Sequence, residues 1–209
     1  MEFIVPPLHT HWGKEMKVAL IQHTPNPEEH IGLLAGICYG KTGEQDPEQC
    51  IKRATHCVTK GHLSTLRFAH ATFLIEDISR ICSHQFVRSK HLDFLQRSQR
   101  YCNESEVAVV IPSTIESEIG DKVNDAVQSL VYLYQELLDD GVKKEDARFI
   151  LPQGTTTELL AVGNFQAWYD FIKLRSGKEA QWEIREVAHE INRQLHGIAP
   201  NIFKELGDG

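Results

Sequence analysis

The 209-residue sequence lacks the apolar run of about 20 residues that a helix needs to cross a bilayer. Its first residues, MEFIVPPLHTHWGKEMK, lack the basic stretch followed by an apolar stretch that marks a secretory signal. The five cysteines form no C-x-x-C pair, which favours reduced thiols over a disulfide scaffold. We therefore expect a cytoplasmic protein that does not act at a membrane.

Several catalytic motifs are also missing. The sequence has no G-x-x-x-x-G-K-[ST] loop and no G-x-G-x-x-G turn, so neither P-loop nor Rossmann chemistry is supported. No G-x-S-x-G elbow surrounds Ser98, which leaves a serine hydrolase using one of the 11 histidines poorly supported. The histidines, His9 and His11 included, show no i, i+4 pairing beside a carboxylate, so we expect no metal site.

Positive charge is scarce overall, with 22 Lys and Arg against 29 Asp and Glu, which argues against non-specific binding to nucleic acid. Between Arg88 and Arg100, however, four cations accompany one acid. Guanidinium groups match phosphate oxygens, and Ser and Gln add neutral donors. In an extended segment, Gln96, Ser98 and Arg100 would point to one side and could hold a sugar and its phosphate. A solvated basic face paired with acids elsewhere is the equally weighted alternative.

The pattern of apolar residues and of Pro and Gly predicts helices interleaved with a few strands. Residues 1–15 read as an arm, and residues 16–209 as a single domain. Strands are expected at 16–24, at 68–79 and from 147, where Pro152 interrupts the last. Helices are expected at 28–40, 47–61, 79–90, 121–140, 164–175 and 179–196. This order indicates an α/β or α+β fold without choosing between them.

Ordered motifs narrow the function. SRICSHQFVRSK at 79–90, followed by QRSQRY at 96–101, resembles the signature of the flavin-dependent thymidylate synthases: R-H-R, seven residues, then S-x-R, with S-H-Q before it. Blocks such as GHLSTLRFAHATFLIEDISR, NFQAWYDFIKLR and AQWEIR resemble further motifs of that family in the same order. The resemblance extends over roughly residues 16–200.

The resemblance implies a central, mostly antiparallel sheet flanked by helices, in a homotetramer with active sites between subunits. It also implies FAD, reduced by NADPH, and methylenetetrahydrofolate as the one-carbon donor that methylates deoxyuridine monophosphate at C5. Carried over position by position, the nucleotide would contact Gln85, Arg88, Gln96, Ser98, Arg100, Arg148 and Arg175. Flavin and folate would contact His62, Ser64, Arg88, Ser89, Lys90, Gln96, Asn164, Gln166 and Asp170.

Among these, the catalytic candidates are Arg88, Ser98 and Arg175. By the resemblance, Arg100 and Arg148 hold the phosphate, while Arg88 and Arg175 approach the pyrimidine. An arginine that donates to a uracil carbonyl would stabilise negative charge on the ring. Ser98 is then a ligand contact rather than a covalent nucleophile, because the cofactors supply the chemistry.

The sequence departs from the family pattern where flavin and folate are expected. The R-H-R triplet is RSK at 88–90, an acid and a histidine of the S-x-x-E-H block are replaced by Arg67 and Phe68, and Gln166 and Asp170 replace the usual residues. One hypothesis keeps FAD, with Arg67 balancing Asp170 and Lys90 holding the pyrophosphate. Others are a 5-hydroxymethyl product, a cytosine nucleotide as substrate, or a non-catalytic nucleotide-binding paralogue.

Overall fold

The computed structural model describes residues 16–41, 43, 46–115 and 118–204. The expected arm at 1–15, with His9 and His11, lies outside these residues. Among the described residues the chain forms two compact units: unit 1 holds 16–17, 76–84 and 96–159, and unit 2 holds 18–75, 85–95 and 160–204.

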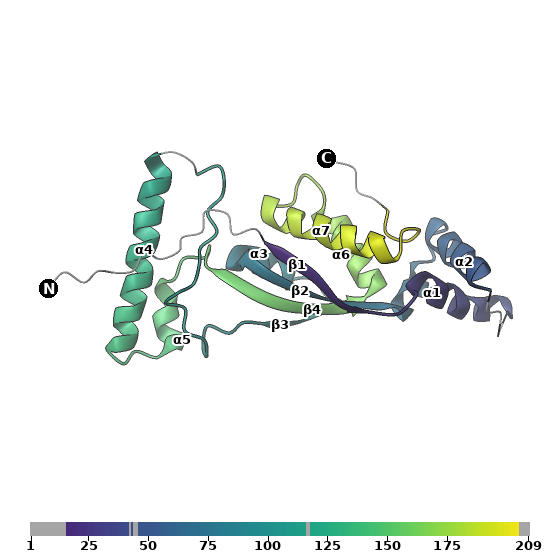
Figure 1. The fold of residues 1–209 in the computed structure, drawn as a ribbon, viewed down its shortest axis with the longest axis horizontal. Helices are drawn as coiled ribbons and strands as arrows, with labels where there is room; N and C mark the ends of the chain where they lie inside the picture. The colour runs from purple at the N-terminus through teal and green to yellow at the C-terminus, as the bar shows by residue number, and fades with distance from the viewer. Residues whose placement is uncertain (1–15, 42, 44–45, 116–117, 205–209) are drawn as a thin grey trace. The chain divides into compact units, whose positions relative to one another are not determined.

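Four strands form one sheet, in the order β1 (Lys17–His23), β2 (His70–Ser79), β4 (Thr156–Asn164) and β3 (Leu92–Gln96) (Figure 1). Backbone hydrogen bonds join the end of each strand to the start of its neighbour, as from Thr24 to His70 and from Phe165 to Ala69. This pairing is antiparallel. Together with the helices, the sheet makes the fold α+β, which resolves the choice that the sequence left open.

The helices of unit 2 begin and end largely where proline and glycine predicted. They are α1 (Pro27–Ala35), η1 (Gly36–Tyr39), α2 (Pro47–Thr59), η2 (Leu63–Phe68), α6 (Phe165–Arg175) and α7 (Trp182–Ile198). Asp46 caps α2 by accepting from the Glu48 N–H at 3.1 Å, with Pro47 in the first turn. Gly40 adopts the left-handed conformation at the end of η1, with φ of 67°, which costs glycine little.

An aromatic cluster forms the centre of unit 2. Trp168 is fully buried and contacts Phe73 edge-on, with ring centroids 5.0 Å apart. Phe86 packs on Phe171 at 4.5 Å. The Trp168 indole donates to the Ala71 carbonyl at 3.0 Å, so its one polar atom is satisfied. Burial of these rings contributes about 2–3 kcal/mol each and fixes the position of α6.

Unit 1 contains α4 (Glu118–Asp139), α5 (Lys144–Ala147) and η3 (Arg148–Ile150) (Figure 1). The helix α3 (Arg80–Phe86) directly follows β2. Tyr134 of α4 is fully buried, and its hydroxyl accepts from the Glu104 N–H at 3.4 Å. That bond attaches the segment after β3 to α4. None of the described helices is both long and apolar enough to cross a membrane.

Two local predictions are wrong in unit 1. The segment 147–152 is not a strand, because η3 follows α5 directly and the Thr155 N–H turns back to the Pro152 carbonyl at 3.0 Å. The strand begins only at Thr156. The segment 96–100 is not extended either: β3 ends at Gln96, and the Ser98 carbonyl accepts from the Tyr101 and Cys102 N–H groups.

The helix expected at 79–90 is shorter than predicted. It ends at Phe86, where the Ser89 N–H donates to the Phe86 carbonyl at 3.0 Å and closes a turn. Residues 88–90, the start of the basic stretch, therefore lie on a turn and not on a helix face. Arg88 and Lys90 are exposed there, and Ser89 is half-buried.

Candidate functional site

The candidate nucleotide residues divide between the two units. Unit 1 holds Gln96, Ser98, Arg100 and Arg148, and unit 2 holds Gln85, Arg88 and Arg175. Each set is described within its own unit.

Gln96, at the end of β3, is fixed by two hydroxyl groups. Its amide donates to Ser83 Oγ at 2.9 Å and to Thr157 Oγ1 at 3.3 Å. Ser83 in turn donates to the Arg80 carbonyl at 3.0 Å. These bonds engage the amide nitrogen of Gln96 and leave its carbonyl oxygen as the group available to a sugar hydroxyl.

The turn after β3 presents Ser98 and Arg100. The half-buried Ser98 accepts from the Arg100 N–H through its hydroxyl oxygen at 3.3 Å, besides the two N–H groups bound to its carbonyl. A hydroxyl that accepts from the main chain can still donate its own proton to a ligand oxygen. This geometry fits a binding role. Among the described residues, no hydrogen bond is seen between Ser98 and a histidine that could act as its base.

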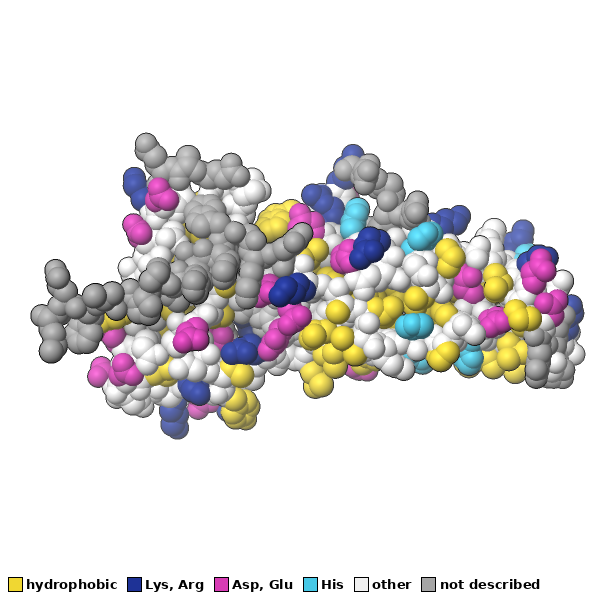
Figure 2. Space-filling view, viewed as in Figure 1, with side chains coloured by type: hydrophobic (Ala, Val, Ile, Leu, Met, Phe, Trp, Pro, Cys, Tyr) yellow, Lys and Arg dark blue, Asp and Glu magenta, His cyan; other side chains and the backbone are white. Residues whose placement is uncertain are grey.

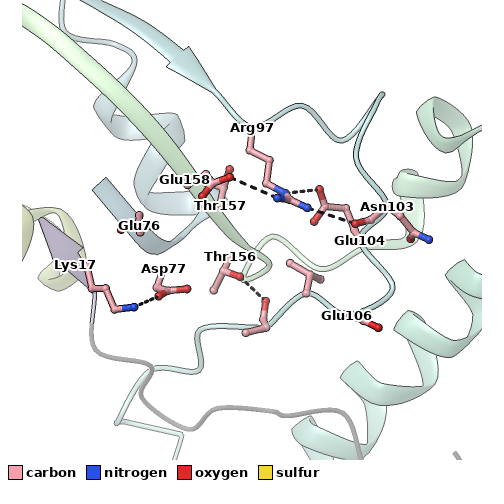
Figure 3. Close-up of a pocket in the computed structure, with 12 residues that line it drawn as sticks. Lys17, Glu76, Asp77, Arg97, Asn103, Glu104, Glu106, Thr156, Thr157 and Glu158 are labelled. Carbon is pink, nitrogen blue, oxygen red and sulfur yellow. Dashed lines mark hydrogen bonds and ion pairs between the residues drawn. The ribbon is translucent and has the colours of Figure 1, made fainter. Parts of the chain in front are cut away.

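Arg97 holds this turn in place. Its guanidinium contacts Glu104 at 3.3 Å, Glu158 at 3.4 Å and the Asn103 carbonyl at 3.5 Å (Figure 3). Burial alone would lower the pKa of Arg97, but the carboxylate of Glu104 and the other acceptors outweigh it and raise the pKa overall. Arg97 is therefore a structural cation, although it belongs to the same basic stretch as the candidate ligands.

Arg100 and Arg148 meet at α5. The Arg100 guanidinium contacts Glu145 Oε2 through Nε at 3.0 Å and Nη2 at 2.9 Å. Arg148 donates from Nε to the main-chain carbonyl of Glu145 at 3.1 Å. Two arginines that lie 48 positions apart in the sequence thus share one partner residue.

Arg80 is a cation of this region to which the sequence analysis gave no role. Burial lowers the pKa of Arg80, and the nearby positive charge of Arg148 lowers it further. Like charges held near each other favour an anion between or beside them. The signal was present in the quoted SRICSHQFVR block, but only the fold shows that Arg80 lies near Arg148.

In unit 2, Arg175 at the end of α6 reaches the last turn of α3. Its Nη2 donates to the Gln85 carbonyl at 3.1 Å. Its Nε is buried, and no hydrogen-bond partner is recorded for it in the described part of the chain. A buried charged donor without a partner is costly, so this N–H group is suited to donate to a ligand carbonyl oxygen. Gln85 is half-buried and Arg88 is exposed on the following turn.

A second group of candidates surrounds a cavity of about 260 Å³ in unit 2. It is lined by Arg67, His91, Asn164, Gln166, Ala167 and Asp170. Three of the positions predicted for the cofactor lie here, and His91 is a lining residue that the sequence analysis missed. Asn164 also caps α6, because its Oδ1 accepts from the Ala167 N–H at 2.9 Å.

Arg67 spans this cavity to Gln166. Its Nε donates to Gln166 Oε1 at 2.7 Å, across 99 positions of sequence. Its recorded partner is thus Gln166 and not Asp170, the residue whose charge it was expected to balance, although both charges line the cavity. His62, Ser64, Ser89 and Lys90 are not among the lining residues: His62, Ser64 and Lys90 are exposed, and Ser89 is half-buried.

A larger cavity of about 390 Å³ in unit 1 has the wrong charge for a nucleotide (Figure 3). Five carboxylates line it against two cations, Lys17 and Arg97. Both cations are already paired, Lys17 with Asp77 at 3.6 Å and Arg97 with its two glutamates. A phosphate dianion would meet net negative charge there, so this cavity is not the candidate site.

Comparison with known proteins identifies the family. The family model described as "Thymidylate synthase complementing protein" matches residues 19–201. A flavin-dependent thymidylate synthase of Geobacter sulfurreducens is 38% identical over 204 residues, covering 93% of this chain and 88% of the relative. Enzymes with the same name from Clostridium tetani and Thermococcus onnurineus are 30% and 36% identical, covering 93% and 89% of this chain and 89% and 80% of each relative. The chain therefore belongs to the thymidylate synthase complementing protein family, the family of the flavin-dependent thymidylate synthases.

Proposed function

We propose that the protein transfers a one-carbon unit from methylenetetrahydrofolate to C5 of deoxyuridine monophosphate and so makes thymidylate, in a flavin-dependent reaction. The observation that carries this proposal is the meeting of Arg100 and Arg148 at Glu145, next to Ser98. Family membership supplies the reaction class, and the two arginines supply a phosphate site for the nucleotide.

The nucleotide residues take separate roles in this proposal. Arg100 and Arg148 bind the phosphate, Ser98 donates to one of its oxygens, and Gln96 offers its carbonyl to the sugar. Arg175 uses its orphaned Nε to donate to a pyrimidine carbonyl, which stabilises negative charge that builds on the ring. Gln85, whose main-chain carbonyl accepts from Arg175, and Arg88 on the turn that follows complete the pyrimidine side.

The cavity of unit 2 fits the ring system of a flavin by the chemistry of its donors. If the flavin ring binds here, Arg67, His91 and the amides of Asn164 and Gln166 would be its hydrogen-bond donors, and Asp170 would be an acceptor. When bound, FAD supplies the reducing equivalents, which it takes from NADPH. Lys90, Ser89, His62 and Ser64 lie outside the cavity lining and are proposed to contact the rest of the cofactor or the folate.

The departures from the family pattern support a second candidate. Arg67, Gln166 and Asp170 all line one cavity, so they change a single chemical environment. Such a change favours altered handling of the transferred carbon, which would yield a 5-hydroxymethyl product, or a cytosine nucleotide as substrate. A non-catalytic nucleotide-binding paralogue is the further alternative.

We also propose a cytoplasmic homotetramer with sites between subunits, formed by one domain over residues 16–209. Exposed hydrophobic side chains support association, and Figure 2 shows such side chains gathered in patches on the face displayed. Two of the most exposed, Tyr101 at 76% and Phe149 at 83%, directly follow Arg100 and Arg148 in the sequence. A second subunit covering them would enclose the phosphate site.

Titration of the purified protein with FAD, followed by visible spectroscopy, tests the cofactor assignment. Arg67→Ala should weaken FAD binding, because it removes the cavity's guanidinium and the bond to Gln166. Arg193→Ala, which removes an exposed arginine on α7, is the matched control and should bind FAD like the wild type. A wild-type protein that FAD cannot titrate would overturn the flavin assignment.

A further inference from the structure

Glu145 contacts both candidate phosphate arginines. Its carboxylate accepts from Arg100, and its main-chain carbonyl accepts from Arg148. The next residue back, Lys144, donates from Nζ to the Tyr101 carbonyl at 2.9 Å. The short helix α5 is thereby bound to the turn after β3 at Arg100 and at Tyr101.

In its contact with Arg100, the Glu145 carboxylate occupies the edge of the guanidinium that a phosphate would use. One carboxylate oxygen, Oε2, takes both the Nε and the Nη2 of the guanidinium. A phosphate oxygen approaches a guanidinium along this same edge, in the same plane and at similar distances. The Tyr101 ring adds a cation–π contact, with its centroid 5.8 Å from Arg100 Cζ.

We propose that Glu145 is a selectivity residue whose carboxylate holds Arg100 until a phosphate replaces it. This inference rests on the proposed function, because it takes Arg100 and Arg148 as the phosphate ligands. Nucleotide binding is then an exchange, in which a phosphate dianion displaces a monovalent carboxylate from the guanidinium edge. A nucleoside, which has no phosphate, cannot make the exchange.

The exposure of the pair sets the size of the effect. The side chains of Arg100 and Glu145 are 55% and 38% exposed, so solvent screens their attraction. Exposed pairs of this kind contribute up to about 1 kcal/mol, which corresponds to roughly fivefold in affinity. The bound phosphate would also be repelled by the displaced carboxylate nearby. Removing the charge of Glu145 should therefore strengthen phosphate binding by about threefold to tenfold.

Glu145→Gln removes the negative charge of this side chain and keeps its shape and the surrounding contacts. The amide has nearly the size and shape of the carboxylate, and the substitution leaves the Arg148 bond to the main-chain carbonyl and the Lys144 bond to Tyr101 in place. Calorimetric titration of the full chain should give a dissociation constant for deoxyuridine monophosphate about threefold to tenfold below that of the wild type. Inorganic phosphate should show the same gain, and deoxyuridine should show none.

Glu190→Gln is the matched control, because Glu190 is also a partly exposed carboxylate paired with an arginine, Arg193, on α7 of unit 2, and no nucleotide role is given to either residue. It should leave the affinity for the nucleotide unchanged. The gain from Glu145→Gln should shrink when NaCl is raised from about 0.05 to 0.5 M, since salt screens exposed charges. A variant with only a packing defect would not show this salt dependence.

The outcomes separate this inference from the function on which it rests. If the wild type binds the nucleotide and Glu145→Gln binds it equally or more weakly, the exchange is refuted and the proposed function stands. If the wild type binds neither the nucleotide nor inorganic phosphate, the phosphate site itself is wrong and both fail. A gain that appears equally with deoxyuridine would also refute the selectivity role.

Discussion

Arg175 allows a sharp separation of stability from function. In unit 2 its Nη2 donates to the Gln85 carbonyl, while its buried Nε has no recorded partner among the described residues. Arg175→Met keeps an unbranched side chain of similar length and removes both donors. We expect the variant to fold almost as well as the wild type and to bind the nucleotide much more weakly.

The magnitude follows from two opposing contributions to the free energy of unfolding. Loss of the charged hydrogen bond to Gln85 costs about 1.5–3 kcal/mol, whereas removal of an unsatisfied buried donor returns about 1–3 kcal/mol. The net change should lie within about 1 kcal/mol, which is about 2–4 °C in Tm for a chain of this size. Loss of a charged donor to the pyrimidine should weaken binding by about 2–3 kcal/mol, or roughly 30- to 150-fold.

Thermal unfolding and calorimetric titration with deoxyuridine monophosphate measure the two quantities separately. Arg53→Met is the matched control, because Arg53 is also half-buried and donates to a main-chain carbonyl, that of Gly32, at 2.8 Å. It should lose stability and keep its nucleotide affinity, which is the opposite pattern. A loss of more than about 3 kcal/mol in Arg175→Met, or unchanged affinity, would refute the role given to the orphaned Nε.

Three further predictions concern the phosphate site and the stability of α7. Arg100→Ala should weaken nucleotide binding by about 2 kcal/mol, roughly 30-fold, and unchanged affinity in calorimetry would contradict its role. Gln194→Ala should lower the free energy of unfolding in urea by about 2–3 kcal/mol, because that side chain bonds twice to the main chain of β1; a loss below about 0.5 kcal/mol would contradict this. The hydrogen bond from Arg193 lowers the pKa of Glu190 below its ordinary 4.5, so ionised Glu190 stabilises the fold above that pH and loses the effect as pH falls. Wild type and Glu190→Gln should therefore differ in unfolding free energy at neutral pH, and the difference should shrink as the pH falls below 4.5; a constant difference would contradict the assignment.

Proline, glycine and apolar spacing predicted the elements that depend on local chemistry. Helix α2 begins at Pro47 and is followed by Gly61 with a positive φ of 76°, and the strand expected at 16–24 is β1. These boundaries could be predicted from the sequence because each is set by the conformational limits of one residue. The four-stranded sheet order was not readable, since it depends on which segments pair over long distances.

The turn after β3 shows why part of the site was not predictable. An alternation of side chains at Gln96, Ser98 and Arg100 matched an extended strand. The chain turns instead, because the Ser98 carbonyl accepts two main-chain N–H groups and Arg97 binds Glu104 and Glu158. One of these partners lies 61 positions away, and such a partner leaves no periodic signal in the local sequence.

Glu145 and His91 were not predicted for the same reason, because their roles depend on residues far away in the sequence. The carboxylate of Glu145 binds Arg100, which lies 45 positions away in the sequence. Only its main-chain bond to Arg148, three residues further on, is a local contact. His91 belongs to no motif that the sequence analysis used, and it lines the cavity only because unit 2 places it beside Asn164 and Gln166. The motif residues indicated the reaction class, while these supporting residues required the fold.

Mass spectrometry of the product tests the central claim most directly. The protein would be incubated with FAD, NADPH, methylenetetrahydrofolate and deoxyuridine monophosphate, and with deoxycytidine monophosphate in a parallel reaction. We predict a product 14 mass units heavier than deoxyuridine monophosphate, about the mass of one methylene group, formed only when NADPH is present. A product that carries an additional oxygen and forms without NADPH, or no product from either nucleotide, would contradict the assignment as a thymidylate synthase.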